Sequence, residues 1–574
     1  MPKTATAPVG EEAPPTTFQQ AAEHTMVTAM TFNPLVVLDN SQILAMLGRV
    51  GARALVQPAT LLSRTLGLGR ELGEIILGRS ERAPDPSDRR FADPTFRDHP
   101  LYRRMMQGYL AWRESLHGLV DEIDLDQESR DRGKFALTLL TEAVAPTNTL
   151  LGNPAALKRA FETAGVSVLK GLRNWARDQV ENHGMPSQVD KRPFQVGENL
   201  AVTPGQVILR SEVLELVQYA PARPTVFERP LLFIPPQVNK YYAFDLAPGR
   251  SMIEHLVEQG LQVFLVSWRN PTAAQRDWGF DTYIQSLCDA LAAVQEITGS
   301  PTVNVTGVCA GGITASIFIA YLAARGNKAI HSASFPVTVL DTSVSSQISV
   351  LSSQKTLEAS KRSSQKKGIL PGPELARVFA LLRPNDLVWN YWVNNYLMGT
   401  DPAPFDILVW NNDPTNLPAA LHGQFLDLFA NHSLLKPGTL KVLGTSIDLS
   451  RVTCDIYAIG ALTDHLTPWY ACYRTPQLFG GEGTFVLSYS GHIQALVNPP
   501  GNPKAKFYTN TAKGLEANEW LAGAKEHKGT WWTHWTDWLG KRSGAEKPAP
   551  PCLGSDAHPP LMAAPGRYVH QKAE

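Results

Sequence analysis

Several features are scarce in this sequence of 574 residues, and each scarcity narrows the range of functions. The five cysteines lie far apart without a CxxC pair: Cys288, Cys309, Cys454, Cys472 and Cys552. This spacing indicates neither a disulfide framework nor a zinc site, and it favours a reducing, cytoplasmic setting. Neither sign of charge is in excess, because 53 Lys and Arg are balanced by 53 Asp and Glu. That balance argues against a nucleic-acid partner.

Long apolar runs are also missing. No apolar stretch reaches the roughly 18 residues that a membrane-spanning helix needs, so we expect no transmembrane segment. Residues 1–20 are rich in Pro, Thr and Glu and do not combine a basic start with an apolar segment. We therefore expect no secretory signal there, but a disordered tail. The hydrophobic content of 43% is ordinary for a globular protein.

The chain changes character near residue 195. Before this point, apolar residues recur at helical spacing, which predicts a helical N-terminal domain over residues 21–195. The helices are expected at about 41–80 (one or two helices), 101–124, 130–143 and 153–183. From 196 to 574, buried strands alternate with helices. This alternation predicts a mainly parallel sheet with helices on both faces.

Residues 342–440 interrupt the alternation. They mix Ser/Gln/Lys-rich stretches with an aromatic segment, LVWNYWVNNYL. An insertion of this size between strands usually forms a cap. Near the C-terminus, four tryptophans lie close together, at positions 531, 532, 535 and 538. They predict a packed helix or, alternatively, a contact surface for a polymer or a partner.

The most informative stretch is Gly307-Val308-Cys309-Ala310-Gly311-Gly312. It has the form of the nucleophile elbow, with cysteine in place of serine. A β-branched run at 302–306 precedes it and a helical run at 313–324 follows it, which is the context that the motif needs. The helix N-terminus would stabilise a thiolate at Cys309. The alternative is a tight turn with a buried structural cysteine.

A cysteine nucleophile needs a base, and in the α/β-hydrolase fold the acid and then the histidine follow the nucleophile along the chain. Asp464 follows the strand DIYAIG, and His492 follows the strand FVLSYS. Loops of this kind meet at the carboxyl edge of a parallel sheet, so we expect Cys309, Asp464 and His492 to come together. His465 competes as the base, but a histidine directly after the acid would point away from it.

An acyl-transfer site also needs donors for the oxyanion. In this fold one N–H comes from the residue after the nucleophile and another from the loop after an earlier strand. We therefore predict the backbone N–H groups of Ala310 and Val238. Val238 lies in the loop that follows the strand RPLLFIPP.

The sequence resembles the polyhydroxyalkanoate synthases, and most closely the type from pseudomonads that prefers medium-chain monomers. The matching segments lie at 91–114, 228–246, 266–272, 307–314 (GVCAGGIT), 382–399, 405–418, 464–469, 490–504 (SGHIQALVNPPGNPK) and 531–539. They span roughly residues 90–570. The stretch FPVTVLD at 335–341 departs from what is expected of the pseudomonad group, so the resemblance leaves monomer chain length open.

The resemblance implies an acyltransferase of α/β-hydrolase fold over residues 196–574. It would polymerise (R)-3-hydroxyacyl-CoA into polyester with release of CoA. By this resemblance Cys309 is the nucleophile, His492 is its base, and Asp464 either activates the substrate hydroxyl or orients the histidine. Arg383, His465 and Asn239 are predicted to contact substrate or CoA.

Further expectations follow from the same resemblance. Thr338 and Gln494 would shape the acyl pocket. No cofactor and no metal are expected, since CoA is only the leaving group. The partners would be the acyl-CoA, the growing polyester, a second copy of the chain in a homodimer and granule-associated proteins, at the surface of polyester granules in the cytoplasm. The alternative function is a thioesterase or a polyester depolymerase on the same fold, which cysteine in place of serine disfavours.

Overall fold

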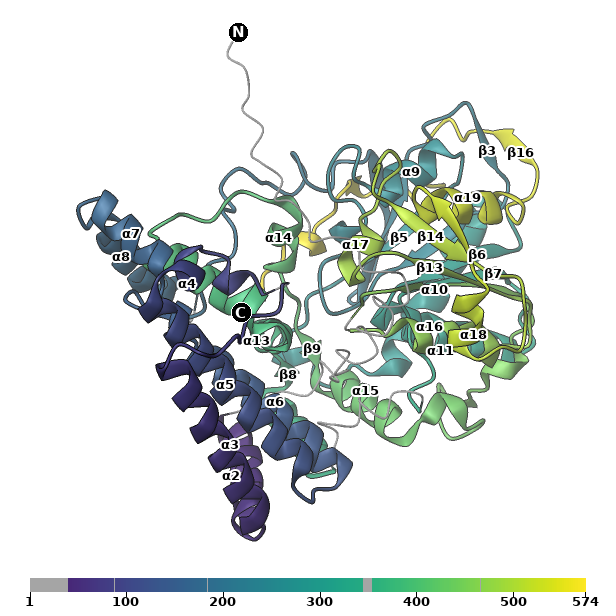
Figure 1. The fold of residues 1–574 in the computed structure, drawn as a ribbon. Helices are drawn as coiled ribbons and strands as arrows, with labels where there is room; N and C mark the ends of the chain where they lie inside the picture. Colours follow the sequence, from purple (N-terminus) through teal and green to yellow (C-terminus); the bar gives the residue numbers. More distant parts are fainter. Residues whose placement is uncertain (1–39, 87, 183, 344–353, 465, 574) are drawn as a thin grey trace. The chain divides into compact units, whose positions relative to one another are not determined.

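The computed structural model describes residues 40–86, 88–182, 184–343, 354–464 and 466–573 (Figure 1). The chain divides into two compact units. Unit 1 contains Asn40–Ser187 and Arg383–Pro402, and unit 2 contains Gln188–Leu382 and Ala403–Glu574. The tail predicted at 1–20 lies outside the described residues. No helix in the described part of the chain is long and apolar enough to cross a membrane.

Unit 1 is helical, as its apolar spacing predicts. Its helices are α2 (Asn40–Leu55), α3 (Pro58–Ile76), α4 (Thr95–Asp98), α5 (Pro100–Glu122), α6 (Gln127–Ala143), α7 (Pro154–Glu162) and α8 (Val166–Glu181), with short 3-10 turns η1 (Arg89–Phe91) and η2 (Pro146–Asn148). The expected helix at 153–183 is two helices. Ala164 and Gly165 have positive φ angles of 48° and 84°, which a continuous helix cannot contain.

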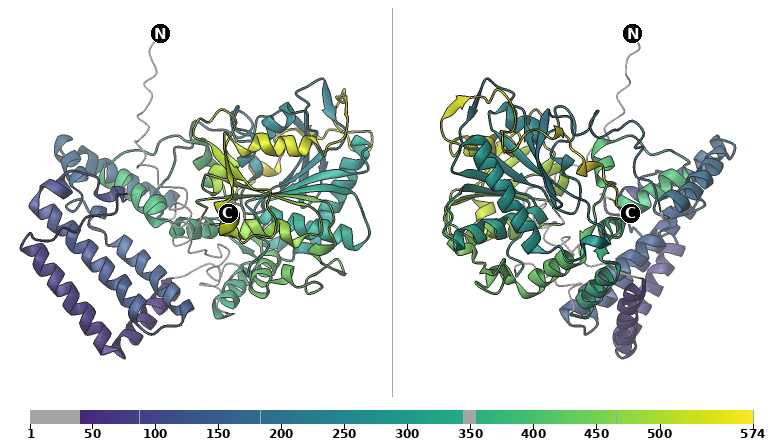
Figure 2. Two further views of the ribbon diagram at one scale, coloured as in Figure 1. Left: turned by 45° about the vertical axis from the view of Figure 1, so that its right-hand side comes forward. Right: turned by 180° about the vertical axis from the view of Figure 1, so that it is seen from behind.

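The helices of unit 1 lie side by side (Figure 2), with α3 along α5 and α2 along α6. Apolar side chains that include Val50, Val120 and Ile123 form one core cluster between them. A second cluster gathers around Phe91, Phe96 and Tyr109. Burial of these side chains, at about 25 cal/mol per Å² of apolar surface, is the main source of stability for a helical assembly of this kind.

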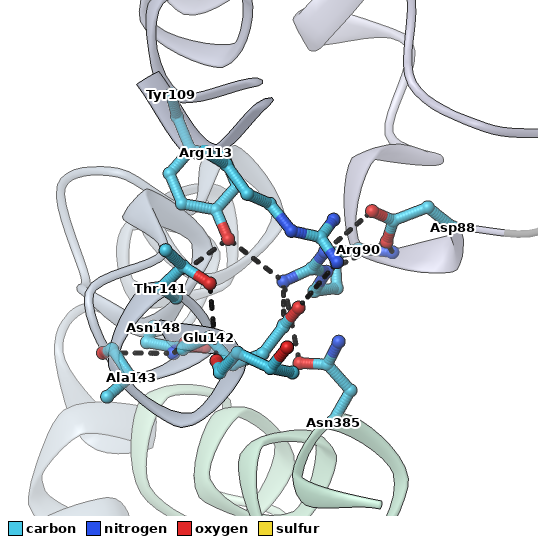
Figure 3. Close-up of polar contacts among 10 residues, drawn as sticks. Asp88, Arg90, Tyr109, Arg113, Thr141, Glu142, Ala143, Asn148 and Asn385 are labelled. Carbon is cyan, nitrogen blue, oxygen red and sulfur yellow. Dashed lines mark hydrogen bonds and ion pairs between the residues drawn. The ribbon is translucent and has the colours of Figure 1, made fainter. Parts of the chain in front are cut away.

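A buried ionic network lies next to the second cluster (Figure 3). Glu142 is only 2% exposed and pairs with Arg90 and Arg113. Arg90 also pairs with Asp88 at 2.7 Å and donates to Asn385 Oδ1 at 3.4 Å. Although burial opposes the charge, the bonds with Asp88 and the field of Glu142 raise the pKa of Arg90. The network therefore joins elements that are almost 300 positions apart in sequence.

The segment Arg383–Pro402 belongs to unit 1, although the sequence placed it in the cap insertion. It forms two π-helical turns, η6 (Asn385–Trp389) and η7 (Trp392–Leu397). Its contacts with α8 are close: a Cβ on Gly171 would lie 1.8 Å from the carbonyl oxygen of Tyr396. Tyr396 also donates a hydrogen bond to Asp178 at 2.8 Å. The aromatic residues of this segment therefore serve to pack it on the helices of unit 1.

Unit 2 is built on an 11-stranded sheet with the order β15-β14-β13-β12-β7-β6-β4-β5-β2-β1-β17. The six central strands are parallel, and the strands beyond β5 and β13 are antiparallel. The strand bounds are β1 (Gly205–Arg210), β2 (Leu214–Tyr219), β4 (Leu231–Ile234), β5 (Val263–Trp268), β6 (Val303–Gly307), β7 (Ile330–Pro336), β12 (Asp455–Ala461), β13 (Gly483–Ser488), β14 (Lys506–Thr509), β15 (Lys525–Lys528) and β17 (Met562–Ala563). The predicted parallel strands form the centre of the sheet, but the sheet as a whole is mixed rather than mainly parallel, because antiparallel strands extend it at both edges.

Helices cover both faces of the sheet (Figure 1). Those on one face include α9 (Met252–Glu258) and α19 (Trp531–Gly540); those on the other include α10 (Phe280–Thr298), α11 (Ala310–Ala324), α16 (Trp469–Arg474) and α18 (Ala517–Ala522). Trp531, Trp532 and Trp535 are 0% exposed and Trp538 is 8% exposed. Of the two readings of the tryptophan cluster, the packed helix is therefore correct.

The remaining elements of unit 2 lie in connections. The insertion contains α12 (Gln354–Lys367), β8 (Ile369–Leu370), α13 (Gly372–Leu382), α14 (Asp406–Asn411), β9 (Leu417–Pro418), α15 (Ala419–Asn431) and η8 (Ser433–Leu435). Elsewhere lie β3 (Thr225–Phe227), η3 (Tyr241–Ala243), η4 (Ala273–Gln275), β10 (Lys441–Val442), β11 (Thr445–Ser446), η9 (Leu449–Arg451), η10 (Thr475–Leu478), α17 (His492–Leu496), β16 (Glu546–Pro548) and η11 (Tyr568–His570).

Candidate active site

Cys309 occupies a strained turn between a buried strand and a buried helix. β6 ends at Gly307, and α11 begins at Ala310. Cys309 has φ 51° and ψ −122°, a conformation that non-glycine residues rarely adopt. Its backbone N–H donates to Pro336 O at 3.2 Å, and the N–H of Val308 donates to Ile234 O at 3.2 Å. Both neighbouring strands therefore hold the turn in the geometry of a nucleophile elbow.

Two glycines allow the elbow to pack this closely. A Cβ on Gly311 would lie 2.4 Å from the carbonyl oxygen of Pro235, in the loop after β4. A Cβ on Gly312 would lie 2.1 Å from Oγ1 of Thr338. Any side chain at either position would push the elbow away from its neighbours.

Asp464 and His492 meet at the carboxyl edge of the same sheet. Asp464 follows β12, and His492 is the first residue of α17, after β13. Hydrogen bonds between the two loops, Leu462 N to Ser488 O (2.9 Å) and Thr463 N to Ser490 O (3.1 Å), continue the strand pairing beyond the sheet. His492 Nδ1 consequently lies 2.6 Å from Asp464 Oδ2, with the two side chains 7% and 0% exposed.

Thr467 contacts both members of this pair, and it was not among the site residues predicted from the sequence. Its hydroxyl donates to Asp464 Oδ2 at 2.6 Å, and Oγ1 of Thr467 lies 3.1 Å from His492 Nδ1. Asp464 Oδ1 accepts from the backbone N–H groups of Leu466 and Thr467, at 2.8 and 3.0 Å. The signal was available: Asp followed three positions later by Thr is typical of a turn in which the carboxylate accepts from the backbone.

The electrostatics favour a charged pair. Burial opposes the imidazolium of His492, but the Asp464 carboxylate outweighs it and, together with hydrogen bonding to Cys309, raises the pKa of His492 to about 10. Burial also opposes the charge on Asp464, yet His492 and Thr467 lower the pKa of that carboxyl. Since Nδ1 faces Asp464, Nε2 is the nitrogen left for the thiol of Cys309. This arrangement suits a histidine that receives the thiol proton.

Burial disfavours the thiolate form of three further cysteines. Burial raises the pKa of Cys288 to about 11 and that of Cys454 to about 12, and it raises the pKa of Cys472 as well. A raised thiol pKa reduces the fraction of thiolate at neutral pH. All five cysteines lie in the described part of the chain and are free thiols there.

One of the two predicted oxyanion donors, Ala310, lies in the elbow, and the other, Val238, lies in the loop after β4. Ala310 is the first residue of α11, where backbone N–H groups have no partner within the helix. Val238 lies in the loop after β4, and its carbonyl oxygen accepts from Thr415 N at 3.1 Å. Because Gly311 contacts Pro235 at the start of this loop, the loop runs directly beside the elbow. The donor roles remain predictions.

The residues predicted to contact CoA or substrate belong to different parts of the chain. Arg383 lies in unit 1, has a side chain 53% exposed and forms an ion pair with Asp386. Asn239 is in the loop after β4 and donates weakly to Trp410 O at 3.5 Å. His465 lies outside the described residues. All three roles stay predictions.

The two predicted acyl-pocket residues differ in setting. Thr338 is fully buried beneath the elbow and donates to the carbonyl oxygens of Pro336 (3.0 Å) and Gly307 (3.4 Å), so its visible contacts support the elbow. Gln494 is exposed, and its side chain caps α17 by accepting from Gly491 N at 3.4 Å. Their pocket roles stay predictions. In the described part of the chain, no cluster of three or more His, Cys, Asp or Glu is arranged to hold a metal ion.

The sheet order, the cysteine elbow and the Asp464–His492 pair at its carboxyl edge define a protein of the α/β-hydrolase fold. A family model described as "alpha/beta hydrolase fold" matches residues 239–499. A second model, described as "Poly-beta-hydroxybutyrate polymerase (PhaC) N-terminus", matches residues 87–256.

Relatives identify the family. The chain is 48% identical to "Poly(3-hydroxyalkanoate) polymerase 1" of Ectopseudomonas oleovorans, covering 96% of this chain and 98% of that protein. Polymerase 2 of the same organism is 44% identical (94% and 96% covered). The polymerase subunit PhaC of Cupriavidus necator is 39% identical (86% and 85% covered). The chain belongs to the poly(3-hydroxyalkanoate) polymerase family, is an enzyme of that family, and resembles the pseudomonad type as expected.

Among solved structures, a hydrolase from Pseudomonas aeruginosa PA01 aligns with 51% of this chain and 92% of its own, at a TM-score of 0.31 and 14% identity. The strand order of the sheet and the match to the family model define the fold.

Proposed function

We propose that this enzyme polymerises (R)-3-hydroxyacyl-CoA into polyester through a thioester on Cys309, with release of CoA. The observation that carries the proposal is the strained cysteine elbow together with the buried His–Asp pair, in which Asp464 and Cys309 both raise the pKa of His492. A nucleophile beside a base that is itself oriented by an acid is the arrangement that acyl transfer requires.

The first half-reaction exchanges one thioester for another. His492 takes the proton from the thiol of Cys309, and the thiolate attacks the carbonyl carbon of the acyl-CoA. The S–C bond to CoA breaks, and the CoA thiolate leaves with the proton held by His492. The N–H groups of Ala310 and Val238 would stabilise the oxyanion of the intermediate.

The second half-reaction transfers the acyl group to an alcohol. His492 accepts the proton of a 3-hydroxyl group, and the alkoxide oxygen attacks the carbonyl carbon of the thioester on Cys309. The bond between that carbon and Sγ of Cys309 breaks, and the thiolate regains a proton from His492. A thioester keeps much of the transfer potential of acyl-CoA, which a serine ester would not. Water must be excluded, because otherwise hydrolysis of the thioester would compete with ester formation. The elements of the insertion that lie in unit 2 are the candidates for excluding it.

For Asp464 the contacts support one of its two predicted roles. The side chain is fully buried, Oδ1 is occupied by two backbone N–H groups, and Oδ2 is occupied by Thr467 and His492. A carboxylate with both oxygens occupied in this way is suited to orienting the histidine rather than to taking a proton from the substrate.

The remaining roles belong to the same proposal. Arg383, His465 and Asn239 would contact CoA or substrate, Thr338 and Gln494 would shape the acyl pocket, and no cofactor or metal is needed. We propose that the chain acts as a homodimer at the surface of polyester granules, together with granule-associated proteins. Exposed apolar side chains on α3 and α8, among them Leu62, Leu66, Leu169 and Leu172, support such contacts.

Incubation of the purified protein with (R)-3-hydroxydecanoyl-CoA tests the reaction. CoA release, monitored with a thiol reagent, should accompany turbid polymer, and mass spectrometry should locate the acyl group on Cys309. Cys309→Ala should lose both CoA release and polymer. Release of free hydroxy acid without polymer would instead identify a thioesterase.

A further inference from the structure

The C-terminal segment Pro565–Lys572 contacts the loop that carries Val238. This loop, residues 235–240, follows β4 and leads into η3. At its end, the ammonium group of Lys240 donates to the carbonyl oxygens of Gln571 and Tyr568. The hydroxyl of Tyr241 donates to the carbonyl oxygen of Pro565 at 3.1 Å. Two consecutive side chains of the loop region thus bind the backbone of one distant segment.

Lys240 is an unusual residue to find in this place. It is only 3% exposed, and lysine is almost never buried without partners. Burial lowers the pKa of Lys240 to about 8, with Asp413 opposing the shift and Lys572 adding to it. Carbonyl oxygens of the C-terminal segment are the hydrogen-bond acceptors for its ammonium group. An ammonium group is costly to bury without hydrogen-bond partners, so these carbonyl oxygens stabilise Lys240 in its buried position.

The C-terminal segment is itself firmly attached to the sheet. Glu215, fully buried in β2, accepts from the backbone N–H groups of Arg567 and Tyr568, both at 2.9 Å. The hydroxyl of Tyr568 donates to Ser211 O at 2.5 Å. β17, just before the segment, pairs with β1. The segment can therefore act as a fixed support for whatever it touches.

The opposite edge of the loop is held by the residues between α14 and β9. Thr415 donates from its backbone N–H to Val238 O (3.1 Å) and from its hydroxyl to Gln237 O (2.5 Å). Asn270 connects this edge with the C-terminal segment: it accepts from Asn416 N at 2.9 Å and donates from its side chain to Lys572 O at 2.6 Å. The loop is thus held by hydrogen bonds on two sides.

We propose that the C-terminal segment Pro565–Lys572 positions the loop after β4, through Lys240 and Tyr241, so that the N–H of Val238 faces the acyl group on Cys309. This inference rests on the proposed function, in which Val238 is an oxyanion donor. Lys240 and Tyr241 are positioning residues, because they act through the loop and do not touch the reacting atoms.

Lys240→Met tests the inference in the full-length enzyme, since methionine keeps the apolar stem and removes the ammonium group. Misplacing one oxyanion donor costs about 10²-fold in kcat, so we expect a fall of about 10- to 100-fold with KM changed less than about threefold. Lys191→Met is the matched control: Lys191 also donates to a backbone carbonyl, that of Asn412 at 3.1 Å, and should leave kcat unchanged.

Alkylation of Cys309 distinguishes a displaced loop after β4 from a general disruption of the active site. Iodoacetamide reacts with the thiolate of Cys309 by displacement of iodide, and this reaction forms no oxyanion. In Lys240→Met its rate at Cys309, followed by peptide mass spectrometry, should equal that of the wild type while acyl transfer falls. Loss of both rates together would indicate a collapsed site and overturn the inference, and so would unchanged acyl transfer.

Tyr241→Phe provides a second, nearly isosteric test. It removes only the hydroxyl that reaches Pro565, so kcat should fall about 3- to 10-fold, as expected for one hydrogen bond, again with alkylation unchanged. If the wild-type enzyme is never acylated at Cys309, the proposed function itself fails. If the wild type is acylated and both variants match it, only this inference fails.

Discussion

His492 Nδ1 lies 2.6 Å from Asp464 Oδ2, and both groups are buried at the carboxyl edge of the central sheet. Asp464→Asn would keep the shape of the acid but remove its charge, and it would favour the wrong tautomer of the histidine. We expect kcat for CoA release to fall about 10³- to 10⁴-fold. Steady-state kinetics with acyl-CoA would measure this, and a loss below tenfold would show that Asp464 does not orient His492.

Thr467 should contribute less, because it supplies one hydroxyl to a carboxylate that keeps two backbone donors. Thr467→Val removes that hydroxyl at nearly constant volume, and one hydrogen bond of about 1.4 kcal/mol corresponds to about tenfold in kcat. Thr467→Ser, which keeps the hydroxyl, is the control and should stay close to the wild-type rate. Equal losses in both variants would argue for a packing role instead.

The coupled pair also makes stability depend on pH. The pKa of His492 is raised to about 10, so the stability that it contributes is complete below the unfolded value of about 6.5 and is lost as pH rises towards 10. The pKa of Asp464 is lowered, so the stability that its carboxylate contributes is present above about pH 4 and is lost as pH falls.

The difference in unfolding free energy between the wild type and His492→Gln should therefore be largest between about pH 4 and 6.5 and shrink towards pH 10. Urea unfolding of both proteins at pH 6, 8 and 9.5 would measure it. A difference that does not change with pH would contradict the charged pair.

The close approach of Gly312 to Thr338 predicts a rescue experiment. Gly312→Ala would place a methyl group 2.1 Å from Oγ1 and 2.6 Å from Cγ2 of Thr338, and we expect a loss of about 1–3 kcal/mol in stability together with reduced CoA release. Thr338→Ala removes both contacting atoms, so the double variant should recover part of each loss. Thermal unfolding and CoA-release assays would show whether it does.

Gly311→Ala should not be rescued in this way, because the nearest atoms are backbone carbonyls of Pro235 and Ile234. If the double variant at Gly312 and Thr338 is no better than Gly312→Ala alone, the tight contact at the elbow lies elsewhere.

In unit 1, Glu142 is the acid that compensates two arginines (Figure 3). Glu142→Ala would leave Arg90 and Arg113 without this buried partner, and we expect about 3–5 kcal/mol of lost stability in urea unfolding. The exposed pair of Glu122 with Arg64 is the control, and Glu122→Ala should lower the free energy of unfolding far less than Glu142→Ala, because solvent screens an exposed ion pair. Similar losses of unfolding free energy in the two variants would contradict a stabilising role of the buried network.

Much of the fold and the order of the site residues could be predicted from the sequence. The glycine-flanked Cys309 between a strand and a helix, followed by Asp464 and His492 after later strands, is a local pattern repeated in a fixed order. In a parallel sheet, carboxyl ends of neighbouring strands share one edge, so local signals are enough to bring distant residues together. The helical character of unit 1 followed in the same way from apolar periodicity.

Other features could not be predicted, because they depend on contacts between segments with no common local signal. The aromatic segment Arg383–Pro402 looked like part of an insertion, and only its packing against Gly171 and Asn148 places it in unit 1. Thr467 is one of many threonines until its hydroxyl is seen between Asp464 and His492.

The sequence by itself determined the elbow, the order of nucleophile, acid and histidine, and the family. Only the tertiary structure decided that the C-terminal segment Pro565–Lys572 lies against the loop after β4. The physical reason is that a backbone carbonyl can accept a hydrogen bond at any residue, so the partner of a buried lysine such as Lys240 has no signature in sequence.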